Sequence, residues 1–269
     1  MLQILICTYN AGICDVPSIL LPPAEGIGYV VSMQYTDACF LEQIPDVLRR
    51  REDVILSTIA GKGLSANRNN ALAHATAEVC VIADDDVRYT LSDLHRIASE
   101  HVAKPKADVL LFQATRPQGL LKEYPPQPFD FAHIPSGYYP SSIEITFKRE
   151  RVKHIPFDLR FGLGSGNIVN GEEEVWLNTL HRKAGRTVCY VPIPIVHTLD
   201  VPQGGAHFAT NPDVQRAKGA KLYYIYGVMG LLRCVKESFA VARREKAARL
   251  WQLLKNTLAG ALYIMRTGR

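Results

Sequence analysis

The chain has 269 residues, of which 47% are hydrophobic and 21% are charged, with 19 Gly and 16 Pro. This length can bury a substantial core, and this composition excludes a disordered, fibrous or multipass membrane protein. The net charge is +5, but residues 218–269 hold eleven Lys and Arg against two Glu, so the rest of the chain is net acidic.

Cysteine usage and the apolar segments predict a cytoplasmic protein. The six cysteines form no CxxC pair, and Cys7, Cys80 and Cys189 lie in apolar runs, which is typical of reduced, buried thiols. The apolar amino terminus has no basic leader or cleavage site, so we expect a first strand there and no signal peptide. Near the other end, the longest uncharged apolar stretch, Leu222–Leu232, has 11 residues. A membrane-spanning helix needs about 20.

Short β-branched runs alternate with helical patterns along the chain. The runs predict strands at 3–8, 29–33, 54–58, 78–83, 108–114, 142–148 and 187–191, and the periodic segments predict helices at 65–77 and 92–103, with Ser65 as the N-cap of the first. This alternation predicts an α/β fold with a mostly parallel sheet flanked by helices. After Thr210 the pattern is helical to the end, so we expect an α/β domain at 1–210 and a basic helical region at 211–269.

Ligands of such sheets bind beyond the carboxyl ends of the strands. Three predicted strand exits are polar, at residues 8–10, 34–37 and 84–86. The segment 120–140 is rich in Pro and aromatic residues, so we expect a long ordered loop that forms one wall of a substrate site.

The strongest chemical signal is the acidic triplet Asp84, Asp85 and Asp86, which directly follows an apolar strand. Three adjacent carboxylates repel one another, and a divalent cation such as Mg²⁺ or Mn²⁺, shared with substrate phosphates, relieves that repulsion. The alternative is a solvated acidic turn that caps the next helix.

Arg68 lies in the first turns of the predicted helix upstream of this triplet. A guanidinium beside a metal-binding turn suits a diphosphate, because it adds bidentate charge-assisted hydrogen bonds. The alternative is a surface arginine on an ordinary helix.

A glycine-rich segment with Gly164 at its centre precedes three glutamates at 172–174. The glycines permit close approach to a ligand. Helical spacing places Glu173 on the apolar face and Glu174 on the opposite face, so Glu173 is the candidate general base and Glu172 the fallback. The alternative is that these carboxylates only stabilise the start of a helix.

His197 follows an apolar run and is the best available nitrogen ligand for a metal in this site, with His207 as a weaker candidate. The alternative for His197 is a hydrogen-bonded structural histidine.

Together these segments resemble the family 2 glycosyltransferases of the GT-A fold. The resemblance covers about residues 2–200 and rests on five segments in order: ICTYN at 6–10, GLSANRN at 63–69, IADDDV at 82–87, GEEEVWL at 171–177 and VPIPIVH at 191–197. It implies a Rossmann-like sheet, a nucleotide-sugar donor, a divalent metal, inversion at the anomeric carbon and a role in surface polysaccharide synthesis.

The resemblance also implies roles for single residues. Thr8 and Asn10 would line the nucleotide pocket, Arg68 would lie by the base or diphosphate, and Asp84 and Asp86 would be the acids of the DxD motif, with Asp86 the principal metal ligand. Glu173 would be the catalytic base. The second strand ends in Gln34 and Asp37 in place of the family's Asp-rich turn, and since Gln34 can both donate and accept hydrogen bonds we expect a UDP-sugar. Asp85 and Gly164 complete the predicted donor site.

Competing functions leave some of these features without a role. A sugar nucleotidyltransferase would need a basic Gly-rich loop after the first strand, and a glycosidase would leave the acidic triplet and Arg68 unused. An inactive glycan- or nucleotide-binding scaffold remains an alternative. The basic helical region predicts either an anionic membrane surface, where a glycan or lipid-linked acceptor would be met, or packing within the protein. Nucleic acid is not an expected partner.

Overall fold

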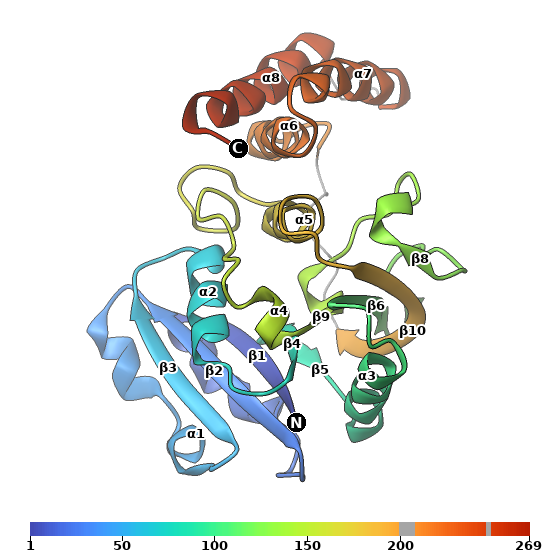
Figure 1. The fold of residues 1–269 in the computed structure, drawn as a ribbon. Helices are drawn as coiled ribbons and strands as arrows, with labels where there is room; N and C mark the ends of the chain where they lie inside the picture. Colours follow the sequence, from blue (N-terminus) through green and yellow to red (C-terminus); the bar gives the residue numbers. More distant parts are fainter. Residues whose placement is uncertain (199–207, 246–248) are drawn as a thin grey trace. The chain divides into compact units, whose positions relative to one another are not determined.

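The computed structural model describes residues 1–198, 208–245 and 249–269, and these are shown in Figure 1. They divide into two units. The first, here called the sheet unit, comprises Met1–Phe157 and Thr179–Val201, and the second, the helical unit, comprises Asp158–Asn178 and Pro202–Arg269. This division differs from the boundary at residue 210 expected from the sequence, because residues 158–178 group with the C-terminal helices. The division of the chain into domains at residue 210 stays a prediction.

The described strands of the sheet unit form one sheet in the order β3-β2-β1-β4-β9-β6-β10-β5, with β7 on β6 and β8 on β10. Their bounds are β1 Leu2–Tyr9, β2 Ile27–Tyr35, β3 Val54–Ala60, β4 Val79–Asp84, β5 Val87–Arg88, β6 Val109–Arg116, β7 Gly119–Leu120, β8 Phe129–Asp130, β9 Ile145–Lys148 and β10 Val188–Thr198. The pairs β1–β2, β1–β4, β2–β3 and β6–β10 are parallel, whereas β9 is antiparallel to both its neighbours. The mostly parallel sheet expected from the sequence is confirmed.

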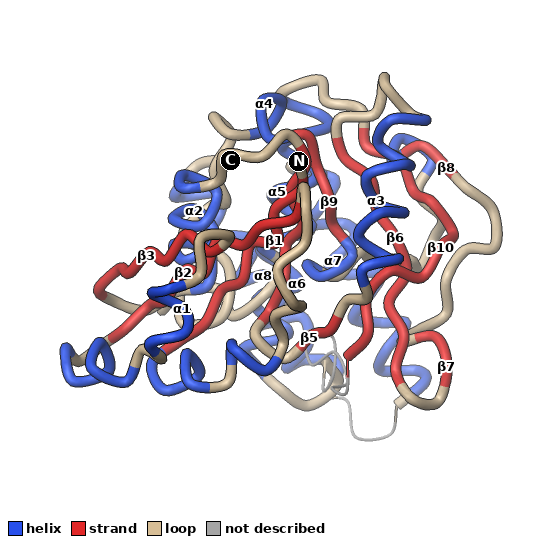
Figure 2. The backbone as a smooth tube through the Cα atoms, turned by 90° about the horizontal axis from the view of Figure 1, so that it is seen from below, coloured by secondary structure: helices blue, strands red, loops and turns tan. Residues whose placement is uncertain are grey.

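Helices cover this sheet as the alternating pattern predicts. The α-helices of the sheet unit are α1 Asp46–Arg50, α2 Leu64–His74, α3 Leu91–Ala103 and α4 Arg149–Val152, and short 3-10 turns lie at Asn10–Cys14, Val16–Ser18, Ala38–Gln43, Phe131–His133 and Ser142–Glu144, with a π-helical turn at Thr179–Lys183. The helix α2 packs on β1, β2 and β3, and α3 packs on β10 (Figures 1 and 2). Buried apolar residues such as Ile4, Val31 and Phe112 fill the core.

Three local predictions were wrong at their edges. The segment 142–148 begins as a 3-10 turn and becomes a strand only at Ile145, because Ser141 and Glu144 form a capping box. The N-cap of α2 is Gly63 and not Ser65, because Ser65 is already the second residue of the helix and its side chain is buried. The last strand continues to Thr198, with irregular pairing around Pro194 that accommodates its missing N–H.

The helical unit consists of α5 Glu172–Asn178, α6 Pro212–Tyr226, α7 Val228–Arg244 and α8 Leu250–Thr267. The helices α6 and α8 touch backbone to backbone: a Cβ atom at Gly260 would lie 1.9 Å from the Arg216 carbonyl oxygen, and one at Gly219 would lie 1.7 Å from that of Thr257. No helix among the described residues is both long and apolar enough to cross a bilayer.

Candidate functional site

The polar strand exits of the sheet unit meet at one edge of the sheet. Strand β1 lies between β2 and β4, with Cys7 opposite both Ser32 and Asp84. All three strands run in the same direction, so their carboxyl ends, and the polar residues that follow, are adjacent. This is the edge at which parallel α/β sheets bind ligands.

A tight contact joins the exits of β1 and β4. The buried Thr8 donates a hydrogen bond from Oγ1 to Asp85 Oδ2 over 2.5 Å. Gly12 lies against both groups, since a Cβ atom there would come within 2.7 Å of each oxygen. Burial raises the pKa of Asp85 and the charge of Asp84 adds to this effect, although the hydrogen bond from Thr8 opposes it. Asp85 therefore fixes the turn that follows β1.

Asp84 is held from two sides. The guanidinium of Arg68, on α2, lies with Nη2 3.3 Å from Asp84 Oδ1, and the Ser142 hydroxyl donates to Asp84 Oδ2 over 3.4 Å. Arg68 is only 4% exposed, so its charge acts in a partly desolvated setting where ion pairs are stronger than in water. The interpretation of Arg68 as an ordinary surface arginine was wrong, because its side chain is buried at the sheet edge.

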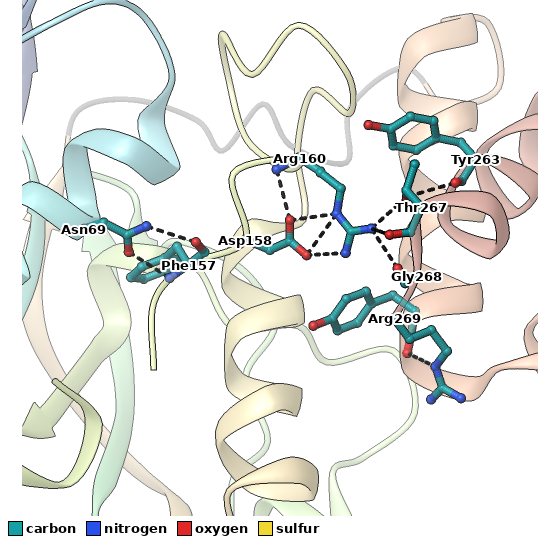
Figure 3. A network of polar contacts seen from close by, with 9 residues as sticks. Asn69, Phe157, Asp158, Arg160, Tyr263, Thr267, Gly268 and Arg269 are labelled. Carbon is teal, nitrogen blue, oxygen red and sulfur yellow. Dashed lines mark hydrogen bonds and ion pairs between the residues drawn. The ribbon is translucent and has the colours of Figure 1, made fainter. Parts of the chain in front are cut away.

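Asn69, the next residue of α2, binds the backbone of Phe157, the last residue of the first segment of the sheet unit. Asn69 donates from Nδ2 to the Phe157 carbonyl over 3.0 Å and accepts the Phe157 N–H at Oδ1 over 2.7 Å (Figure 3). Arg68 lies over the Phe157 ring, with Cζ 5.8 Å from its centroid. The two residues together fix Phe157 beside α2.

Asn10 joins the exits of β1 and β2. It has a φ of +50°, rare for a residue other than glycine, and its Oδ1 accepts the Thr36 N–H over 3.0 Å while Nδ2 donates to Thr36 Oγ1 over 3.2 Å. A conformation of this kind persists where the surrounding contacts enforce it, and it is common at functional sites. Gln34 is buried next to this bridge, opposite Tyr9 in the sheet.

Asp37 lies in the exposed turn after β2. Its Oδ1 accepts the Cys39 N–H over 2.9 Å, and hydrogen bonds from Cys39 lower the pKa of Asp37. Asp37 therefore caps the 3-10 turn Ala38–Gln43, and its carboxylate stays ionised in that role.

The three residues predicted to ligate a metal, Asp84, Asp86 and His197, do not form a three-ligand group in the described part of the chain. Asp86 is exposed in the turn after β4. His197 lies 3.3 Å from Asp93 Oδ2 through Nε2 and 2.6 Å from Thr115 Oγ1 through Nδ1, so both of its nitrogens have partners. In the described part of the chain, no group of three or more His, Cys, Asp and Glu side chains is arranged to hold a metal ion. His207 lies outside the described residues.

The three glutamates of the helical unit have distinct surroundings at the start of α5. Glu172 is 5% exposed, and Glu173 and Glu174 are half-buried. Glu174 does not point into solvent as its helical spacing predicts, because its carboxylate pairs with Lys221 of α6. Burial alone would lower the pKa of Lys221, but the charges of Glu174, Glu173 and Glu172 raise it overall. Glu174 is therefore held as a carboxylate against α6.

A glycine-rich loop precedes α5. Gly164 has a φ of +76°, in the left-handed region that favours glycine. Before this loop, Arg160 pairs with Asp158 over 2.6 Å and donates from Nη1 to the Gly268 carbonyl and to Thr267 Oγ1, each over 2.7 Å (Figure 3). These bonds tie the base of the loop to the end of α8.

Two residues that support the site have no recognisable signal in the sequence. Asn67 is buried on α2, donates from Nδ2 to the Thr8 carbonyl over 2.9 Å, and accepts the Ser32 hydroxyl. Ser142 lies in a segment that reads as a strand. Only the pairing of β4 with β9 brings it to Asp84.

Comparisons with known proteins concern the family and the fold of the chain. Residues 41–168 match the family model described as Glycosyl transferase family 2. This match includes Arg68, Gly164 and the acidic triplet at 84–86. No curated protein sequence matches the chain.

Solved structures with a similar fold include three of S. aureus TarS 1-349. One has a TM-score of 0.61 at 15% identity, one in complex with UDP has 0.60 at 16%, and one in complex with UDP-GlcNAc has 0.55 at 14%. Each comparison covers 100% of this chain and 92% of the other. At these identities the likeness concerns the fold, which is GT-A.

Proposed function

We propose that the chain, a glycosyltransferase with a family 2 domain, transfers a sugar from a UDP-sugar to a hydroxyl group of a glycan or lipid-linked acceptor, with inversion at the anomeric carbon. The observation that carries this proposal is the buried Arg68 beside Asp84 at the shared exit of β1, β2 and β4. A buried guanidinium at this edge suits a diphosphate. TarS structures of this fold with UDP and UDP-GlcNAc support the choice of nucleotide.

In this proposal the nucleotide lies along the strand exits. Thr8, Asn10, Gln34 and Asp37 line the side of the base and ribose, and Gly164 allows the donor to approach the backbone of its loop. Arg68 binds the diphosphate and stabilises the negative charge that grows on it as the sugar departs. Asp84, held by Arg68 and Ser142, faces the ribose.

The acidic turn suits a divalent cation. Asp84 and Asp86 supply hard oxygen donors at the end of β4, and Mg²⁺ or Mn²⁺ is commonly held by one or two carboxylates with substrate phosphates completing the shell. His197 does not fit, because Asp93 and Thr115 occupy its nitrogens. When bound, the cation would neutralise part of the charge of the diphosphate. Asp86 is the principal ligand in this proposal, because it is exposed, whereas the Asp84 carboxylate already contacts Arg68 and Ser142.

Glu173 is the proposed general base. Its side chain is half-buried with Oε2 enclosed, whereas the carboxylate of Glu174 is paired with Lys221 and Glu172 is only 5% exposed. The Glu173 carboxylate takes the proton of the acceptor hydroxyl, and the oxygen forms a bond to the anomeric carbon as the bond to the diphosphate breaks. Glu172 is the alternative base.

Thermal stabilisation by nucleotides tests the donor site. UDP with Mn²⁺ is expected to raise the melting temperature of the wild type, because a bound ligand at a hundredfold excess over Kd adds about 2.7 kcal/mol of stability. GDP and CMP are expected to leave the melting temperature unchanged. Asp86→Ala is expected to lose the Mn²⁺-dependent part of the shift. Asp46→Ala, which removes an exposed carboxylate on α1, is the control and should keep it. A full Mn²⁺-dependent shift in Asp86→Ala would contradict the metal role.

The acceptor is proposed to be met at an anionic membrane on the cytoplasmic side, with α7 as the contacting face. Val228, Leu232, Val235 and Phe239 are exposed at 70%, 62%, 38% and 48%, and their spacing places them on one stripe of the helix. Exposed Arg233 and Lys236 lie beside the stripe, and exposed Arg243 lies one turn beyond Phe239. An exposed apolar face with basic flanks is typical of helices that lie on anionic lipid surfaces.

Sedimentation with vesicles of equal parts phosphatidylglycerol and phosphatidylcholine tests this face. The double variant Leu232→Glu with Phe239→Glu is expected to lower the partition coefficient at least about tenfold, because burying each apolar side chain is worth about 1.5–3 kcal/mol. Leu159→Glu, which alters a leucine that is 59% exposed outside α7, should bind as the wild type does. Equal sedimentation of the double variant and the wild type would rule out α7 as the contacting face.

A further inference from the structure

A buried polar network outside the proposed donor contacts lies under the loop 120–141 of the sheet unit. Its centre is an ion pair between Lys122 Nζ and Glu144 Oε1 at 2.8 Å, with side chains that are 10% and 0% exposed. Breaking a buried pair by removing one partner leaves an uncompensated charge, which makes such a pair structurally decisive. Nothing in the proposed reaction uses either charge.

Glu144 collects hydrogen bonds from the loop. The Tyr124 hydroxyl donates to Oε1 over 2.7 Å, the Tyr138 hydroxyl donates to Oε2 over 3.4 Å, and the Ser141 N–H donates to Oε2 over 3.1 Å. Burial raises the pKa of Glu144, although Lys122, the Tyr124 hydroxyl and the Ser141 N–H oppose that effect. One carboxylate therefore ties together residues that span the whole loop.

Lys122 fixes the other side of the same loop. Its ammonium donates to the Tyr139 carbonyl over 2.6 Å and to Ser141 Oγ over 3.0 Å. It also lies 4.5 Å from the centroid of the Tyr139 ring and 5.4 Å from that of Tyr138. Cation–π contacts add to the hydrogen bonds and hold the aromatic residues around the ion pair.

The network ends at the donor site. Glu144 is the last residue of the 3-10 turn Ser142–Glu144, and Ser142, at the other end of that turn, donates to Asp84 Oδ2. The turn is short and buried, so a displacement of Glu144 also displaces Ser142. Tyr124 extends the support to the sheet by accepting the Ala114 N–H of β6 over 2.9 Å.

We propose that Lys122 and Glu144 are positioning residues for the donor site, which act through the turn Ser142–Glu144 to hold the Asp84 carboxylate in place for the nucleotide. This inference rests on the proposed function, in which Asp84 binds the donor. It also assigns a task to the Pro- and aromatic-rich loop: the loop is the packing layer that seals the ion pair from water.

Two readouts on the full chain test the inference. The first is hydrogen–deuterium exchange of the segment 81–88, which contains Asp84 and needs no ligand. The second is the calorimetric affinity for UDP in the presence of Mn²⁺. Glu144→Gln replaces the carboxylate by an amide of nearly the same size and removes the charge. It is expected to speed exchange over 81–88 and to weaken UDP binding about tenfold or more, the loss seen when residues that orient metal or substrate ligands are altered.

A matched control separates positioning from general stability. Asp53→Asn breaks the 2.6 Å ion pair with Arg51, in which the two side chains are 15% and 16% exposed. This pair lies at the amino end of β3, away from the carboxyl ends of the strands that hold Asp84. Like Glu144→Gln it should lower the melting temperature. It should leave both the exchange of 81–88 and the affinity for UDP unchanged.

Ser142→Ala keeps the test decisive if Glu144→Gln does not fold. It removes only the hydroxyl that contacts Asp84, and it is expected to shift both readouts in the same direction. Unchanged exchange over 81–88 in the folded variants would overturn the proposal, and so would wild-type affinity for UDP in them. A wild type that binds no UDP would contradict the proposed donor, while exchange would still decide the positioning role.

Discussion

Replacing Glu173 by glutamine is expected to lower kcat about a hundredfold to ten-thousandfold, the usual contribution of a general base, and to leave the affinity for UDP unchanged. The amide has nearly the size of the carboxylate but cannot accept the proton of the acceptor. The measurement is hydrolysis of the UDP-sugar that gives the largest thermal shift, in which water replaces the acceptor, together with calorimetry of UDP binding.

The neighbouring glutamates provide the controls for this prediction. Glu174→Gln breaks the ion pair with Lys221, whose side chain is only 15% exposed, so it is expected to lower stability more than turnover. Glu172→Gln should retain turnover if Glu173 is the base. Full hydrolysis by Glu173→Gln, with a loss in Glu172→Gln, would transfer the role to Glu172. Full hydrolysis by both variants would remove this helix start from the mechanism.

Gly260→Ala is expected to destabilise the helical unit by about 3 kcal/mol, the upper part of the usual cost of overpacking. Helix propensity alone predicts the opposite sign, a gain of about 1 kcal/mol, because alanine is the better helix former. The difference arises because the added Cβ atom would meet the Arg216 carbonyl oxygen at 1.9 Å and the Ala220 nitrogen at 2.9 Å. Both are backbone atoms of α6, so α8 must move away as a whole.

Urea denaturation followed by circular dichroism measures this effect. Ala259→Leu, at the exposed neighbouring position of the same helix, adds more atoms and should change stability by less than about 0.5 kcal/mol, as surface substitutions do. A Gly260→Ala variant as stable as the wild type, or more stable, would show that α6 and α8 do not pack backbone to backbone.

Local sequence patterns predicted most of the sheet unit. Apolar runs of strand length predicted β1 to β4, and every predicted end lies within two residues of the observed one. The reason is that buried parallel strands are continuously hydrophobic and their exits are polar. The acidic triplet was found for the same reason: Asp84 ends a buried strand. The prediction for 142–148 was less accurate, because a capping box favours a 3-10 turn where propensity favours a strand.

The contacts that define the candidate site were beyond sequence reasoning. Ser142 and Asp84 are 58 residues apart, and only the placement of β9 next to β4 makes them neighbours. Likewise, periodicity assigned Glu174 to the solvent face of its helix. Periodicity within α5 carries no information on Lys221, which lies 47 residues further along the chain on α6 and pairs with Glu174.

The sequence by itself determined the fold class, the family resemblance and the carboxyl-end location of the polar residues, because each of these depends on patterns within a single strand or helix. Tertiary structure decided which carboxylates are paired, which glycines separate two helices, and where His197 directs its nitrogens. These outcomes depend on atoms from distant segments that meet at hydrogen-bond or van der Waals distance, and no periodicity within one segment specifies its partner.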